Sequence, residues 1–129
     1  MNLKPKFFPI DIALADLCAV VIVASGGDAF NYVEAVARGV WCDDANMSDP
    51  IEVASRLTAT GHDADAIIAK ARMSEIEDIR RRNTADAIAA DAVGVPAYVL
   101  NGEVFFGQDR IADLERAIVE GRPPLTAKC

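Results

Sequence analysis

The chain is short of basic side chains, and this shortage removes one class of partner. It has 13 Lys and Arg residues against 20 Asp and Glu residues, which gives a formal net charge of -7 at pH 7. Proteins that bind the phosphate backbone of nucleic acids need clustered positive charge. The run of three arginines at residues 80–82 is flanked by Glu75, Glu77 and Asp78, which is typical of a solvated helix face. No nucleic-acid partner is therefore expected.

Cysteine, histidine and long apolar runs are also scarce. Cys18, Cys42 and Cys129 are widely spaced and form no Cys-x-x-Cys pair, and His62 is the single histidine. Such a set favours neither a zinc site, nor a disulfide scaffold, nor a thiol–disulfide oxidoreductase, so no metal is expected and a reduced, cytoplasmic setting fits best. The most apolar run, residues 17–24, is far shorter than the ~20 residues that span a bilayer, so no membrane partner is expected.

The 129 residues, 52% of them apolar, supply enough material for one packed domain. Helical spacing and capping residues predict five successive helices over the first two thirds of the chain. They run from Asp11 to Ser25, from Ala29 after the cap Asp28 to about Val40, from the Ser48-Asp49-Pro50 start to Gly61, from Asp63, and from Ser74 to about Ala92. Residues 19–24 followed by Gly26 also fit a buried parallel strand, but the length counted from Asp11 favours a helix.

After Gly94 the pattern changes from helical to extended. Residues 97–100 and 103–106 are apolar runs that flank Asn101-Gly102, and Asn-Gly between apolar runs is the strongest short-range signal of a β-hairpin. Asp109 is then expected to cap a last helix, from Arg110 to Glu120. The sequence thus predicts a hairpin followed by a helix.

Two short motifs at the ends of this hairpin could carry chemistry. Val95-Pro96 leads directly into the first strand; a cis bond there would leave the backbone of Val95 available to an extended ligand, whereas a trans proline that simply begins a strand is the plainer alternative. Phe106-Gly107-Gln108-Asp109 forms the turn from strand to helix. The helix start suits a ligand carboxylate and Asp109 suits a ligand ammonium, unless Asp109 is only a cap and Gln108 only a solvated loop residue.

The run Gly94-Val95-Pro96-Ala97-Tyr98-Val99-Leu100-Asn101-Gly102-Glu103-Val104-Phe105-Phe106-Gly107-Gln108-Asp109-Arg110 resembles the C-terminal end of 2-hydroxychromene-2-carboxylate isomerases. These enzymes are bacterial relatives of kappa-class glutathione transferases. Upstream segments resemble the helical insertion of the same family: Lys6-Phe7-Phe8-Pro9, Ala15-Asp16, Val40-Trp41 and Ser48-Asp49-Pro50. The resemblance therefore covers nearly the whole chain.

The resemblance implies an α/β fold, a DsbA-like thioredoxin fold with a helical insertion. In this chain it would be mostly helical, with about six helices plus the C-terminal hairpin and helix. Residues 1–93 would form the helical insertion domain and residues 94–129 the C-terminal ββα part of the thioredoxin-like domain. The implied ligand is glutathione. Val95 would pair with its cysteinyl backbone, Pro96 would be cis, and Phe106, Gly107, Gln108 and Asp109 would hold its γ-glutamyl end. At Phe106 the family commonly has tryptophan.

The implied activity is glutathione-dependent isomerisation of a 2-hydroxychromene-2-carboxylate to the trans-o-hydroxybenzylidenepyruvate in aromatic-hydrocarbon breakdown. The family's N-terminal βαβ unit, with the serine that activates the glutathione thiolate, has no counterpart in this sequence. We therefore expect a C-terminal segment of such an enzyme, with no catalytic residue of its own, whose partners are glutathione and a small aromatic substrate. A homodimer or a separate N-terminal segment would complete the sheet. A non-catalytic, partner-dependent remnant is the alternative, and a disulfide oxidoreductase ranks below it.

Overall fold

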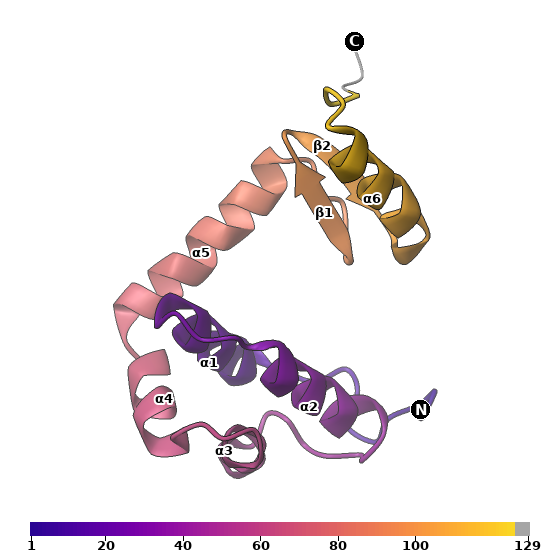
Figure 1. Cartoon of the computed structure of the whole chain (residues 1–129). Coiled ribbons are helices and arrows are strands. Elements are labelled where there is room, and N and C mark those ends of the chain that lie inside the picture. The colour runs from indigo at the N-terminus through magenta and orange to yellow at the C-terminus, as the bar shows by residue number, and fades with distance from the viewer. Residues whose placement is uncertain (126–129) are drawn as a thin grey trace. The chain divides into compact units, whose positions relative to one another are not determined.

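The computed structural model describes residues 1–125, and the chain divides into two compact units, Met1–Arg80 and Arg81–Cys129. Within the described residues there are six α-helices and one two-stranded sheet (Figure 1). The elements are α1 (Ala13–Ala24), α2 (Phe30–Trp41), α3 (Pro50–Ala59), α4 (Ala64–Ala71), α5 (Ser74–Ala89), β1 (Ala97–Leu100), β2 (Glu103–Phe106), a 3-10 turn (Gln108–Arg110) and α6 (Ile111–Glu120). The mostly helical fold with a C-terminal hairpin and helix is as predicted, while the domain division at residues 93 and 94 stays a prediction.

Aspartates begin several of the helices, but not all in the predicted way. Asp49 and Asp63 are true N-caps, whose carboxylates accept hydrogen bonds from the backbone N–H groups of Ile51 and Ala66. Asp11 and Asp28 lie one residue further out, before the cap positions of α1 and α2, and each accepts a hydrogen bond from the N–H two residues on. Residues 19–24 are helical rather than extended, as the length of the run indicated.

The prediction that Asp109 caps the last helix is wrong. The cap position of α6 is Arg110, which makes no side-chain capping bond, and Asp109 lies inside the preceding 3-10 turn. The turn forms because Gly107 has φ 96° and ψ 151°, a conformation essentially restricted to glycine, which sends the chain sharply out of β2. The carboxylate of Asp109 is therefore not committed to the first turn of α6.

The unit Met1–Arg80 has a continuous apolar core. Helix α1 packs against α4, and α1, α2 and α3 contact one another (Figure 1). Tyr32, Met47, Val53, Leu57 and Ile76 are among the side chains that this core encloses almost completely. Burial of this kind contributes about 25 cal/mol per Å² of apolar surface, so the core is the main source of stability for the helical unit.

The unit that begins at Arg81 contains the hairpin and α6. Strands β1 and β2 are antiparallel, with Ala97 opposite Phe106 and Leu100 opposite Glu103. The turn between them has positive φ at both central residues, 51° at Asn101 and 85° at Gly102, the combination that suits a tight two-residue hairpin. Among the described residues of this unit, only Phe105 and Ala117 are buried.

None of the helices in residues 1–125 combines the length and the apolar character that a membrane crossing would require.

Candidate functional site

One hydrogen bond joins the two motifs at the open ends of the hairpin. The backbone N–H of Gly107, just after β2, donates to the carbonyl oxygen of Pro96, just before β1, over 2.9 Å. The bond extends the ladder of the hairpin by one step beyond the Ala97–Phe106 pair. All six residues singled out by sequence are thereby brought to the same end of the two-stranded sheet: Val95, Pro96, Phe106, Gly107, Gln108 and Asp109.

An aromatic contact reinforces this arrangement. A β-carbon placed on Gly94 would lie 3.0 Å from Cε2 and 3.3 Å from Cζ of Phe106, so the Phe106 ring covers Gly94 at contact distance. Glycine at this position lets the ring approach the backbone that leads into Val95. The ring remains about half exposed, which leaves one part of its surface for another molecule.

The carboxylate of Asp109 folds back over the turn. Its Oδ1 lies 2.5 Å from the point that a β-carbon of Gly107 would occupy, so in this position the carboxylate lies directly over the glycine. The N–H of Arg110 donates to the carbonyl oxygen of Gly107 over 3.1 Å, which closes the turn. The guanidinium of Arg110 pairs with Asp113 rather than with Asp109. Asp109 and Gln108 therefore stand as exposed polar groups at the turn between the sheet and α6.

On the strand side, the Val95–Pro96 peptide bond is cis, as the family resemblance implied and against the plainer trans alternative. The Val95 side chain is 93% exposed and packs into no core. An extended peptide-like ligand can approach such a segment through backbone hydrogen bonds, while the turn at residues 107–109 offers a carboxylate to a cationic group.

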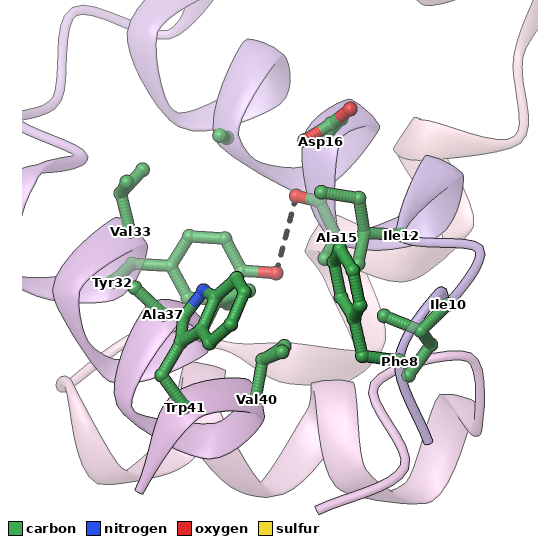
Figure 2. A pocket seen from close by; sticks show the side chains of 12 residues that line it. Phe8, Ile10, Ile12, Ala15, Asp16, Tyr32, Val33, Ala37, Val40 and Trp41 are labelled. Carbon is green, nitrogen blue, oxygen red and sulfur yellow. Dashed lines mark hydrogen bonds between the residues drawn. The ribbon is translucent and has the colours of Figure 1, made fainter. Parts of the chain in front are cut away.

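A pocket that was not predicted from the sequence lies in the helical unit. It is an apolar pocket of about 290 Å³ between α1, α2 and the segment before α1 (Figure 2). Its lining residues are Phe8, Ile10, Ile12, Ala15, Asp16, Ala19, Tyr32, Val33, Val36, Ala37, Val40 and Trp41. Hydrophobic spacing could not reveal it, because the walls come from separate segments that only packing brings together.

Three ionisable groups near this pocket are affected by burial. Desolvation raises the pKa of the Asp16 carboxyl, and the positive charge of Arg80 opposes that rise. Desolvation raises the pKa of the Cys18 thiol to about 11 and also raises that of Tyr32, whose hydroxyl donates a hydrogen bond to the Ala15 carbonyl oxygen over 3.2 Å. A thiol with so high a pKa is a poor nucleophile, so Cys18 serves as a small core residue.

The remaining sequence candidates do not assemble into a site. Among residues 1–125, no group of three His, Cys, Asp or Glu side chains is arranged to hold a metal ion. The ring of His62 contacts that of Tyr32 edge-on, with 6.4 Å between centroids, as part of the helical packing. Cys42 is an exposed free thiol, and Cys129 lies outside the described residues.

Comparison with known proteins places the chain in a family. The model of the DsbA-like thioredoxin domain matches residues 3–119, so the chain belongs to the DsbA-like thioredoxin family. It is 26% identical over 117 residues to a protein named 2-hydroxychromene-2-carboxylate isomerase from Sphingobium xenophagum. The aligned region covers 90% of this chain and 60% of that protein, so the chain spans less than two thirds of this relative's length. No solved structure matches the chain.

Proposed function

We propose that this chain is the glutathione-holding part of an isomerase of the 2-hydroxychromene-2-carboxylate type. Glutathione would lie along the hairpin end: the Val95 backbone pairs with its cysteinyl residue, beside Pro96, while Phe106, Gly107, Gln108 and Asp109 surround its γ-glutamyl group. The observation that carries the proposal is the Gly107–Pro96 hydrogen bond, because it brings the two sequence motifs to one place. The relative named as such an isomerase is aligned with most of the chain and supports the same reading.

The proposed chemistry is nucleophilic catalysis by glutathione. When bound, glutathione would supply a thiolate nucleophile, whose reversible covalent addition to the conjugated system of the substrate would allow rotation about a bond that is otherwise double. Covalent addition divides one difficult step into easier ones. The residues of this chain would orient glutathione so that its sulfur faces the substrate. Their own side chains would take no part in the bond changes.

Isothermal titration with reduced glutathione tests the proposal directly. We expect saturable binding that Asp109→Asn weakens by about tenfold, the loss of one charge-assisted contact of about 1.5 kcal/mol. Asp86→Asn is the matched control, because Asp86 is an exposed aspartate on α5 outside the site. Equal affinity of the Asp109 and Asp86 variants would contradict the contact assigned to Asp109, and no heat with the unmodified chain would contradict glutathione binding by this chain.

One observation favours a second candidate, a non-catalytic remnant that works only with a partner chain. In the described residues the sheet has two strands and the C-terminal unit buries only Phe105 and Ala117, while an isolated hairpin is at best marginally stable in water. An unpaired strand edge invites pairing with another chain. Light scattering after size-exclusion chromatography tests the need for a partner: a homodimer or a larger assembly is expected if pairing completes the sheet, and a stable monomer would contradict it.

A disulfide oxidoreductase is the weakest of the three readings, since the wide spacing of the cysteines provides no Cys-x-x-Cys pair. Location in the cytoplasm is part of the proposal and fits the same sparse cysteine usage.

A further inference from the structure

We propose that the pocket of the helical unit binds an uncharged aromatic molecule of one or two fused rings that carries a hydrogen-bond donor. None of the residues that line the pocket is among those proposed to hold glutathione, and all of them belong to the unit Met1–Arg80. The inference stands on the size of the pocket, its aromatic walls and the sign of its one charge.

Size sets the class of ligand. The pocket holds about 290 Å³. An apolar cavity of ~150 Å³ in a protein core is large enough to bind benzene, so a space of roughly twice that volume suits a bicyclic ring system. It is also near the lower end of the ~300–1,000 Å³ typical of small-molecule sites. A long peptide or a lipid tail would not be contained.

The walls suit a flat ligand. Phe8 and Trp41 stand together at the rim, with ring centroids 5.0 Å apart and planes inclined by 42° (Figure 2). They are 56% and 36% exposed, which is unusual for such large apolar rings and leaves their faces open to a guest. Tyr32 lies deeper, fully buried, with its hydroxyl already bonded to Ala15. Ring stacking on Phe8 or Trp41 adds to the gain from burying the ligand.

The rim is held in place by a third residue. Asp44, just after α2, accepts hydrogen bonds from the side-chain amide of Asn2 and from the backbone N–H of Lys6, at 2.9 Å each. The N–H of Asn2 also donates to the carbonyl oxygen of Trp41 over 2.6 Å. The segment that carries Phe8 is thus tied to the end of the helix that carries Trp41, so the aromatic wall is preformed.

Charge selects against anions. Asp16 is the one carboxylic acid among the twelve lining residues, and none of the twelve is Lys, Arg or His; Arg80, outside the lining, offsets part of the negative charge of Asp16. The Asp16 carboxylate can accept a hydrogen bond from a ligand hydroxyl or N–H, but it repels a ligand carboxylate. At ~5 Å in a high-dielectric setting that repulsion lowers the affinity for the anion roughly fourfold. A phenol or naphthol therefore fits, whereas the chromene carboxylate of the proposed reaction does not.

The test compares two probes of equal ring size, 2-naphthol and 2-naphthoate, by titration of the full chain. Trp41 is the single tryptophan, so its indole N–H signal in a ¹H–¹⁵N spectrum reports binding at the pocket. We expect saturable binding of 2-naphthol that shifts this signal, at least tenfold tighter than that of 2-naphthoate. Asp16→Asn should reduce the ratio to about threefold, while Asp65→Asn, on α4 outside the pocket, should leave it unchanged.

Two filling variants complete the test. Ala37→Leu on the rim and Ala19→Leu on α1 each place a larger side chain in the pocket, and either should weaken 2-naphthol at least tenfold. Ala35→Leu, on the same helix as Ala37 but outside the lining, is the control. The proposal would be overturned if 2-naphthoate bound as tightly as 2-naphthol, or if neither filling variant changed the affinity for 2-naphthol. It would also be overturned if the Trp41 signal were lost because the chain associates with itself at the protein concentration used.

Discussion

The N–H of Gly107 and the carbonyl oxygen of Pro96 form a hydrogen bond of 2.9 Å that unites residues from both ends of the hairpin. Neither group is a side chain, so the contact does not depend on residue type except through backbone conformation. Gly107 has φ 96°, where a side chain would be strained, and Pro96 cannot donate from its own nitrogen. The most informative variants at this site are therefore those that alter the backbone.

Gly107→Ala should destabilise the C-terminal unit by about 2 kcal/mol, since alanine is strained at this φ and ψ and its β-carbon would displace the flexible carboxylate of Asp109. Gly102→Ala is the control: it has φ 85° but no atom within 4 Å of the added carbon, so it carries only the conformational cost of about 1 kcal/mol. Amide exchange in β1 and β2 measures both. Equal amide protection of β1 and β2 in the two variants would show that Gly107→Ala costs no more than Gly102→Ala.

The contacts of Glu103 predict that the segment around Arg122 and Leu125 loses stability in acid. The Glu103 carboxylate accepts hydrogen bonds from Arg122 at 2.7 and 2.9 Å and from the N–H of Leu125 at 2.8 Å, and the Arg122 bond is the main reason why its pKa is lowered to about 2. Because the folded pKa lies below the ordinary value, this stabilisation is complete above that value and is lost as the pH falls towards 2.

The loss of the Leu125–Glu103 hydrogen bond in acid can be followed through the Leu125 amide signal between pH 5 and pH 2. This range spans the ordinary glutamate pKa of ~4.3. We expect the signal to move to a solvent-exposed position as Glu103 is protonated. In Glu103→Ala, which has no acceptor for the Leu125 N–H, the amide should already be exposed at pH 7 and should not change further. A Leu125 signal that is constant to pH 2 in the unmodified chain would refute the assignment.

Asp44→Ala should release the segment that precedes α1. The substitution removes the acceptors for Asn2 and Lys6, each bond contributing about 1 kcal/mol, and places alanine at φ 51°. Trp41 would lose its contact with Phe8, so its fluorescence emission should shift to longer wavelength. Asp44→Asn, which keeps an acceptor oxygen and tolerates this φ, should show the smaller shift. Identical spectra for all three proteins would mean that Asp44 does not hold the aromatic wall.

Leu57→Ala should destabilise the helical unit by about 3 kcal/mol, because the side chain is fully buried and its removal leaves a cavity. The cost should be confined to this unit, since the buried residues around Leu57 all belong to Met1–Arg80. Denaturant unfolding followed by far-ultraviolet circular dichroism gives the loss, and amide exchange in β1 and β2 should be unaltered. Loss of protection in the hairpin would show that the two units unfold together.

Capping and turn residues in the sequence predicted most of the secondary structure. Asp49-Pro50, Asp63 and Asn101-Gly102 begin helices or turn the hairpin where predicted, because a cap or a two-residue turn is decided by a few neighbouring residues. Asp109 shows the limit of such reasoning. Its residue type suits a cap, but the glycine conformation two residues earlier places it inside the 3-10 turn.

The sequence by itself determined the class of this protein, since the helix caps, the hairpin turn and the two motifs at its ends all lie within short stretches of chain. The family match over residues 3–119 agrees with that reading. The tertiary structure alone decided which distant residues meet. Phe8 reaches Trp41 because Asp44, just after α2, holds the segment before Phe8 through Asn2 and Lys6. Contacts of this kind depend on packing between segments remote in sequence, and no periodicity or motif spacing encodes them.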